Sequence, residues 1–258
     1  MIIGIVSGKG GVGKTTIAAN LSYYLSQIGK RVTLIDCNIT TSHLNFTFNL
    51  FFPNATLNNV LRGEKEIKDV IYKYKNLNII PASLSLEDLS YVDLAALKNV
   101  VSKIDTDFVI LDSAPGFGRE AVSVLDSVDT VIFITLPYLT SVVDIIRAKR
   151  ILNELNIFPL GIIVNMVKGK SYELKRREIE ALTKIKVIGE IPYDENVEIA
   201  TTLGKPFIEL FPNTPAARAL KKICNEVFNI AIKEEKKLNF IEKFYEKFRD
   251  LTNKFKII

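Results

Sequence analysis

The sequence predicts an α/β protein built on a mostly parallel sheet of seven or eight strands, doubly wound, with helices on both faces. Short β-branched apolar runs recur at regular spacing, and segments with helical periodicity lie between most of them. The runs are continuously apolar, as expected of strands buried on both sides. Such alternation implies right-handed crossovers, and ligands then bind at the carboxyl ends of the strands.

Seven strands are expected from these apolar runs: Ile2 to Val6, Arg31 to Ile35, Leu77 to Ile80, Phe108 to Leu111, Thr130 to Thr135, Leu160 to Val164 and Val187 to Ile191. Three longer helices follow from the 3.6-residue periodicity: Thr15 to Gln27, Ser141 to Leu155 and Tyr172 to Thr183. The order of these elements predicts one compact domain from residue 1 to about residue 232, followed by a separate tail at 233–258.

Composition narrows the class of protein. The chain has 258 residues, of which 48% are hydrophobic and 24% charged, and this suits a globular protein with a core that needs no disulfide or metal. A net charge of +5 is too mild for a protein that coats nucleic acid. The cysteines, Cys37 and Cys224, lie far apart, which disfavours a disulfide framework, a zinc knuckle or a cysteine-ligated cluster within one chain. We expect a cytoplasmic protein with neither a signal peptide nor a membrane span.

A glycine-rich loop follows the first expected strand and opens the first expected helix. It fits the phosphate-loop pattern G-x-x-x-x-G-K-[ST] with the residues Gly8, Lys9, Gly10, Gly11, Val12, Gly13, Lys14 and Thr15. Glycines let consecutive N–H groups face an anion, and the helix adds its positive end. Lys14 is then expected at the β- and γ-phosphates and Thr15 at Mg²⁺.

Lys9 stands at the second position of this loop. Because of that lysine, the run from Lys9 to Thr16 resembles the deviant Walker A motif of the MinD/ParA ATPases, and the chain as a whole is most similar to archaeal MinD-like proteins. The resemblance implies binding of ATP or ADP with Mg²⁺, and a homodimer that encloses ATP. It also implies that Lys9 reaches the partner's phosphates, and that Thr16 belongs to the nucleotide site.

Two acidic strand ends are similar to the switches of this family. Asp36 begins the segment that looks like the first switch, and Asp112 begins the second, where a carboxylate at a strand end can bind the hydration shell of Mg²⁺. With Thr15, they form the expected metal set. The resemblance further places adenine and ribose at Asn165 and at the residues that close the next strand, Pro192, Tyr193 and Asp194.

One position departs from the family. Where a second aspartate usually orients or activates the attacking water, this chain has Asn38, which accepts a hydrogen bond but takes up no proton at neutral pH. Because phosphoryl transfer depends mostly on positioning and charge, we expect slow ATP hydrolysis, with Lys9, Lys14, Asp36 and Asn38 as the catalytic set. An alternative is that Asp36 itself positions the water.

The tail is strongly amphipathic on a helical wheel. Phe240, Phe244 and Phe248 fall on its apolar face, lysines and an arginine flank that face, and 233–258 holds eight basic and five acidic residues. Such a helix suits an anionic membrane surface, as in MinD proteins, but the same stripe also suits docking on the body or on a partner. With membrane binding, the protein would be peripheral on the inner face of the cell membrane.

The resemblance favours a MinD-like, nucleotide-dependent positional switch, and two related classes of ATPase are the alternatives. ParA-type partition ATPases share the nucleotide motifs and bind DNA through basic residues, here Lys168, Lys170, Lys175, Arg176, Arg177 and Lys184. The iron–sulfur carrier ATPases need cluster cysteines that this chain lacks, unless a dimer brings together two copies of one cysteine. His43, the one histidine, has no partners for a zinc site or a catalytic triad. An activating or cargo protein of unknown identity is expected as a further partner.

Overall fold

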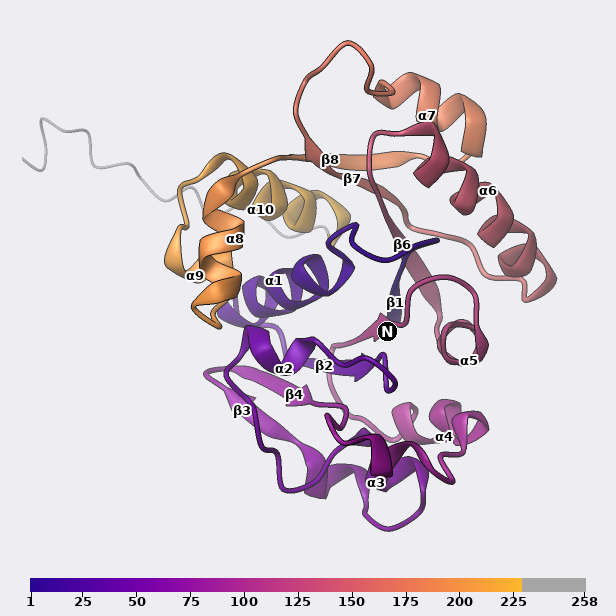
Figure 1. Cartoon of the computed structure of the whole chain (residues 1–258), viewed down its shortest axis with the longest axis vertical. Helices are drawn as coiled ribbons and strands as arrows, with labels where there is room; N and C mark the ends of the chain where they lie inside the picture. Colours follow the sequence, from indigo (N-terminus) through magenta and orange to yellow (C-terminus); the bar gives the residue numbers. More distant parts are fainter. Residues whose placement is uncertain (229–258) are drawn as a thin grey trace, which may run out of the picture. The chain divides into compact units, whose positions relative to one another are not determined.

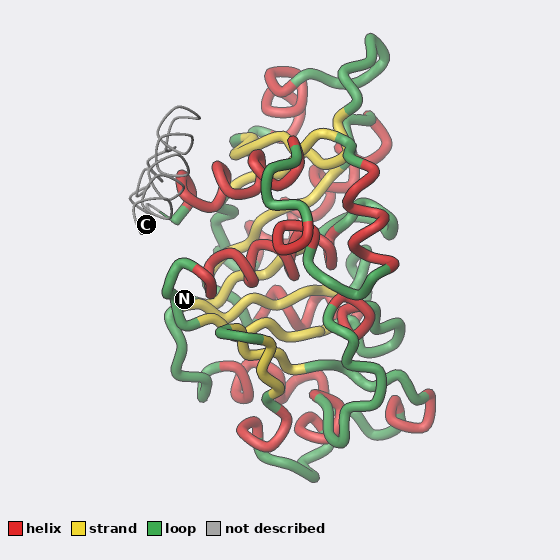
Figure 2. The backbone as a smooth tube through the Cα atoms, turned by 90° about the vertical axis from the view of Figure 1, so that its left-hand side faces the viewer, coloured by secondary structure: helices red, strands yellow, loops and turns green. Residues whose placement is uncertain are grey.

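The computed structural model describes residues 1–228, and the amphipathic segment expected at 233–258 lies outside them. Within this part of the chain an eight-stranded sheet has the order β3-β4-β2-β5-β1-β6-β7-β8. The strands are β1 Ile2–Val6, β2 Val32–Cys37, β3 Tyr72–Tyr74, β4 Leu77–Ile80, β5 Phe108–Ser113, β6 Thr130–Thr135, β7 Gly161–Val167 and β8 Val187–Pro192. Neighbouring strands are parallel except β3 and β4. Figure 2 shows them as one twisted sheet, and the expected fold class is confirmed.

The helices of this part are α1 Lys14–Gln27, α2 Leu44–Thr47, α3 Leu57–Leu61, α4 Leu97–Val101, α5 Arg119–Asp126, α6 Leu139–Glu154, α7 Arg176–Thr183, α8 Glu195–Thr202, α9 Phe207–Leu210 and α10 Pro215–Val227. Three 3₁₀ turns join them: η1 Ile67–Val70, η2 Leu86–Leu89 and η3 Leu94–Ala96. In Figure 1, α1 and α10 lie on one face of the sheet, and α4 to α7 cover the other.

Both faces of the sheet are packed with apolar side chains, because the central strands β1, β2, β5 and β6 carry β-branched residues at successive positions. On the face covered by α4 to α7, Leu111 of β5 and Val124 of α5 belong to one buried cluster, and Phe133 of β6 and Ile145 of α6 belong to another. On the opposite face, Leu21 of α1 is fully buried. Burial on two faces leaves the strand ends as the sites for polar groups.

The sequence placed the strands well and one helix poorly. All seven expected strands are present, with shifts of one to three residues at some ends. The predicted helix at Tyr172 to Thr183 is wrong in its first turn, since α7 begins at Arg176. The buried Glu173 carboxylate instead accepts the N–H groups of Lys168 and Lys170, which closes the preceding segment into a loop. The short antiparallel strand β3 was not expected.

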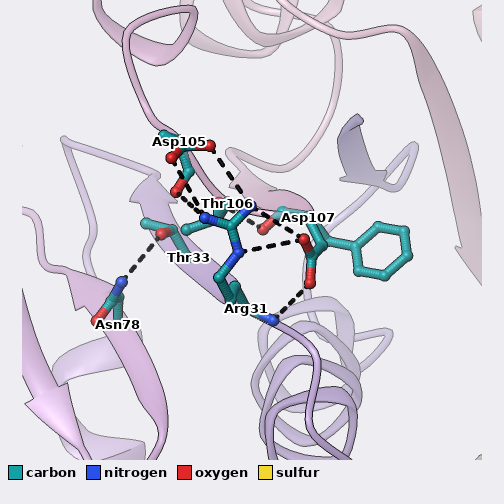
Figure 3. A network of polar contacts seen from close by, with 7 residues as sticks. Arg31, Thr33, Asn78, Asp105, Thr106 and Asp107 are labelled. Atoms are coloured by element: carbon teal, nitrogen blue, oxygen red, sulfur yellow. Dashed lines mark hydrogen bonds and ion pairs between the residues drawn. The ribbon is translucent and has the colours of Figure 1, made fainter.

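A polar network joins β2 to β5 at their amino ends, away from the glycine-rich loop (Figure 3). The Arg31 N–H donates to Asp107 over 2.9 Å, and its guanidinium contacts the carboxylates of Asp107 and Asp105 at 3.2 Å each. The hydrogen bonds and charge of Arg31 hold the pKa of Asp107 below its usual value. These exposed pairs align the strands more than they stabilise the fold.

No helix within residues 1–228 is long and apolar enough to cross a membrane.

Candidate nucleotide site

The glycine-rich loop occupies the turn between β1 and α1, at the carboxyl end of the sheet's central strand. Gly11 and Gly13 have φ angles of 76° and 85°, in the left-handed region that favours glycine, and Gly13 is the N-cap of α1. A Cβ on Gly8 would lie 2.0 Å from the Cβ of Asp144 in α6. The backbone therefore curls before the positive end of a 14-residue helix, the arrangement that binds phosphate.

Lys14 is the first residue of α1 and points into the site. Its Nζ lies 2.8 Å from Oδ1 of Asp112 in β5, and both side chains are buried, at 7% and 1% exposure. The other oxygen of Asp112, Oδ2, is buried with no hydrogen-bond partner among residues 1–228. A buried carboxylate oxygen without a donor is costly unless a cation or ordered water contacts it.

Asp36 lies beside Asp112 because β2 and β5 pair in parallel with these two residues in register. Burial, with the nearby Asp112 charge, raises the pKa of Asp36 to about 7. The Ser42 hydroxyl and the backbone N–H of Asn38 donate to the Asp36 carboxylate at 2.6 Å and 3.0 Å, and favour the charged form. Two carboxylates and one lysine thus form a buried cluster beside the loop.

Asn38 is nearly buried and uses its side chain to close its own loop. Its Nδ2 donates to the Thr41 carbonyl at 2.6 Å, and its Oδ1 accepts the Thr41 hydroxyl at 3.0 Å. An aspartate at this position would have no hydrogen to donate to that carbonyl. The departure from the family pattern thus has a local structural role in this chain.

Lys9, the second loop residue, extends toward α6. Its Nζ donates to the hydroxyl of Thr140 at 3.3 Å. This contact is exposed and its acceptor is an uncharged hydroxyl, so it holds the lysine only weakly. The ammonium group remains available to another acceptor.

A cavity of about 300 Å³ opens above the loop. The loop residues from Lys9 to Thr16 line one side, and Asn38, Thr41, His43 and Pro115 line the other. His43 is exposed at the start of α2, as expected for a polar loop residue. The cavity brings both expected switches to the phosphate loop.

The residues expected to contact adenine and ribose lie together, in a cavity separate from the one that contains the switch residues. Asn165, Pro192, Tyr193 and Asp194 line a second cavity that also contains Gly13, Thr16, Met166 and Phe207. Asn165 donates from Nδ2 to the Val12 carbonyl at 2.9 Å, which ties β7 to the phosphate loop. The Lys168 ammonium lies 4.6 Å from the centre of the Tyr193 ring.

Asp194 has a local structural role besides lining this cavity. It caps α8 by accepting the Asn196 N–H, and its other oxygen accepts the N–H of Ala216 in α10. Hydrogen bonds from Asn196 and Ala216 outweigh its partial burial and lower its pKa.

The residues present fit Mg²⁺ and a nucleotide. The glycine backbone and the amino end of α1 offer N–H groups to phosphates, and one oxygen of Asp112, the carboxylate paired with Lys14, has no hydrogen-bond partner among residues 1–228. Hydroxyl and carboxylate oxygens at Thr15, Asp36 and Asp112 are the donor types that Mg²⁺ prefers. Both cysteines are buried, and burial raises the pKa of each thiol.

This combination of a doubly wound sheet and a glycine-rich loop before a helix defines a P-loop nucleotide-binding protein. The model of the CobQ/CobB/MinD/ParA nucleotide binding domain matches residues 3–207, and the chain belongs to this family of ATP-binding P-loop proteins.

Its relatives include archaeal proteins that match it over almost their entire length. An uncharacterized ATP-binding protein of Methanocaldococcus jannaschii is 36% identical over 256 residues, 97% of each chain. The cell division ATPase MinD of Pyrococcus furiosus has a TM-score of 0.85 and 29% identity, covering 89% of this chain and 99% of that one. The septum site-determining protein MinD of Pyrococcus horikoshii, solved with Mg-ADP, has a TM-score of 0.84 and 29% identity over 93% and 98% of the two chains. The resemblance to archaeal MinD is confirmed.

Several neighbours of the candidate site were not found in the sequence. Thr140 and Asp144 reach the loop from α6, and Ser42 reaches Asp36 across six residues. Thr40 also donates to Glu120 in α5 and so connects the two switch segments. No motif marks Thr140 or Asp144, because only the tertiary fold brings α6 to the loop. Thr40 and Ser42 lie within the segment that resembles the first switch, but their contacts could not be predicted from it.

Proposed function

We propose that this protein is a MinD-like ATPase that forms an ATP-enclosing homodimer and acts as a nucleotide-dependent positional switch at a membrane. The observation that carries this proposal is the Lys14–Asp112 pair beside Asp36, next to a glycine-rich loop whose second residue is Lys9. The matching relatives support an ATP-binding role for this site.

In the proposed site, the backbone from Gly8 to Gly13 and the start of α1 hold the phosphates. Lys14 leaves Asp112 to contact the β- and γ-phosphates, while Thr15, Asp36 and Asp112 hold Mg²⁺ or its water shell. When bound, Mg²⁺ neutralises phosphate charge. Asn165, Pro192, Tyr193 and Asp194 hold adenine and ribose, with Thr16 at the junction of the two cavities.

Hydrolysis in this proposal is slow. Asn38 orients the attacking water through its carbonyl oxygen, but that oxygen already accepts the Thr41 hydroxyl, and the amide accepts no proton. Slow turnover gives a long-lived ATP-bound dimer. The alternative is that Asp36 positions the water, and the two are separated by substitutions described in the Discussion.

Lys9 provides the contact between copies. Its weak, exposed hydrogen bond to Thr140 leaves the ammonium group free to reach the phosphates of a second protomer at little cost. Lys9→Ala is expected to bind ATP with unchanged affinity and to lose ATP-dependent dimerisation, as measured by sedimentation velocity. Dimerisation of Lys9→Ala equal to that of the wild type contradicts this role.

The membrane role rests on the sequence of the tail, which lies outside the described residues. We propose a P-loop ATPase domain at 1–232 and an amphipathic segment at 233–258, whose Phe240, Phe244 and Phe248 enter the acyl boundary while the flanking lysines contact anionic headgroups. One such segment binds marginally, and a dimer that presents two gains by effective concentration. ATP thereby controls attachment to the inner face of the cell membrane.

Co-sedimentation with anionic liposomes tests the proposal. The intact chain and a chain truncated after Ile232 are compared in Mg·ATP and in Mg·ADP. Binding of the intact chain in ATP only, and its loss on truncation, support the membrane switch. If the intact chain binds liposomes in neither nucleotide, the membrane switch is contradicted. The tail then docks on the body of the protein or on a partner.

DNA binding by the ATP-bound dimer is the second candidate. Lys170, Lys175 and Arg177 lie exposed at or near the start of α7, whereas Arg176 is engaged by Glu180. The same preparations are therefore tested with duplex DNA over a range of salt concentrations. A steep loss of ATP-dependent DNA binding with salt, in a chain that ignores liposomes, favours the partition-type function.

A further inference from the structure

A groove of about 280 Å³, lined by both apolar and polar side chains, lies outside the nucleotide site. One wall is the segment from Phe51 to Asn54, between α2 and α3, and the other is Leu84 and Ser85. Thr56, Asn59, Ser83 and Asp88 complete it.

Buried hydrogen bonds hold the two walls together. Asn58 of α3 is fully buried; its Oδ1 accepts the Ser83 N–H at 3.0 Å, and its Nδ2 donates to the Asp88 carbonyl at 3.1 Å. The Leu57 N–H also donates to the Pro81 carbonyl at 2.8 Å. The groove is therefore formed in advance of binding and needs little ordering when a ligand enters.

The rim of the groove exposes large apolar side chains. Phe52 is 96% exposed, and Phe51 and Leu84 are each more than 40% exposed. Phe46 of α2, also exposed, packs edge-on against Phe51 with ring centres 5.8 Å apart, so the apolar surface continues to α2. Contiguous exposed apolar surface of this kind marks an interaction site.

The charge beside the groove is acidic. Asp88 is the charged residue in its lining, Glu87 beside it is exposed, and Arg62 is already engaged by Glu64 at 2.8 Å and by Asp88 at 3.0 Å. The hydrogen bond from Ser83, with that from Arg62, lowers the pKa of Asp88 and keeps it charged at neutral pH. An anionic membrane surface is repelled by this edge, whereas a basic segment is attracted.

We propose that the groove binds a basic amphipathic segment of a second protein, with an aromatic or aliphatic anchor between Phe52 and Leu84 and lysine or arginine facing Glu87 and Asp88. This is the helix-in-groove or extended-peptide mode of recognition.

The groove connects to the candidate nucleotide site through α2. The Ser42 hydroxyl and the Leu44 N–H donate to Asp36 at 2.6 Å and 3.4 Å, and two residues later Phe46 contacts Phe51. A segment bound against Phe51 therefore alters the position of the loop that carries Asn38, and changes the rate of ATP hydrolysis. This coupling rests on the proposed function, whereas binding in the groove does not.

The experiment is a selection from a displayed library of random 16-residue peptides on the full-length protein without nucleotide, with counter-selection on a Phe52→Ser/Leu84→Ser double variant. Selected peptides are synthesised, and their affinities are measured for the wild type, each single variant, Glu87→Lys and Phe158→Ser. Phe158 is the matched control, because it is 83% exposed and precedes β7, which four strands of the sheet separate from β4, the strand before Leu84.

Peptides with an apolar anchor and excess lysine or arginine are expected to be enriched. Their affinity falls at least tenfold in Phe52→Ser, Leu84→Ser and Glu87→Lys and is unchanged in Phe158→Ser. Enrichment of acidic peptides, no enrichment, or equal losses in Phe158→Ser overturn the proposal. Loss of dimers or of liposome binding in Phe52→Ser overturns it as well, and assigns the surface to a second copy or to lipid.

Hydrolysis is then measured with the selected peptide in saturating Mg·ATP. The rate is expected to change severalfold in the wild type and not in Phe52→Ser. An unchanged wild-type rate contradicts the coupling between the groove and hydrolysis, but it does not contradict peptide binding in the groove. A protein that binds the peptide but never hydrolyses ATP contradicts the proposed function alone.

Discussion

The Lys14 ammonium and the Asp112 carboxylate form a buried ion pair of 2.8 Å that joins the first residue of α1 to the end of β5. Asp112 is also in register with Asp36, so Lys14 is the cation of a pocket with two acidic groups.

Replacing Lys14 with methionine is expected to lower the free energy of unfolding by about 3 kcal/mol, since the substitution leaves Asp112 buried without its cation. Urea denaturation measures the change. The double variant Lys14→Met/Asp112→Leu is expected to recover most of the loss, because no unpaired charge then remains at these positions. A single variant as stable as the wild type contradicts this account.

Stability of the metal-free protein is expected to fall as pH rises from about 4 to about 7. The folded-state pKa of Asp36, about 7, exceeds its ordinary value of 3.8, so the folded state binds the proton more tightly than the unfolded state in this range. The slope approaches about 1.4 kcal/mol per pH unit for one such group. Urea titrations at several pH values test it, and Asp36→Asn is the control that should flatten the slope. The carboxyls with lowered pKa, such as Asp107 and Asp194, act in the opposite direction at lower pH.

Asn38→Asp is expected to hydrolyse ATP roughly tenfold faster or more, because a carboxylate accepts the water's proton. The same change removes the donor to the Thr41 carbonyl and is expected to cost about 1 kcal/mol of stability. Phosphate release at saturating Mg·ATP measures the rate. Equal rates in the wild type and Asn38→Asp, together with a changed rate in Asp36→Ala, would shift the water-positioning role to Asp36.

Gly8→Ala is expected to destabilise the protein by about 2 kcal/mol and to weaken ATP binding. Its Cβ would lie 2.0 Å from the Cβ of Asp144 and 3.2 Å from that residue's Cα, so α6 must move away from the loop. Gly118→Ala is the matched control, because its Cβ would meet open space and its φ of −69° suits alanine. Thermal unfolding with and without Mg·ATP compares them, and similar behaviour of the two variants would refute the steric argument.

The sequence predicted the parts of this protein that depend on local pattern. Continuous apolar runs such as Thr130 to Thr135 are strands because both faces are buried, and the loop at Gly8 has its own motif. Strand β3 was missed because three residues with one central lysine carry too little periodicity to be recognised.

The sequence predicted which residues belong to the site where a local motif contains them, but it did not predict the contacts between distant segments. The contact between Lys9 and Thr140 spans 131 positions and exists because β6 lies beside β1, which places the start of α6 next to the loop. The raised pKa of Asp36 likewise depends on burial and on a neighbour from another strand. These relationships are properties of the assembled sheet, and the roles of the site residues remain predictions for the experiments above.

The two margins of the sheet limit how copies of this domain can assemble. On one margin, β3 has three residues with an exposed Lys73. On the other, α7 engages the first residue of β8, since Glu180 accepts the Val187 N–H at 2.8 Å and Arg176 donates to its carbonyl. A short charged margin and an engaged one both oppose the joining of sheets into a continuous ribbon. Strand addition between copies is thereby disfavoured, and the proposed homodimer would form through side-chain surfaces.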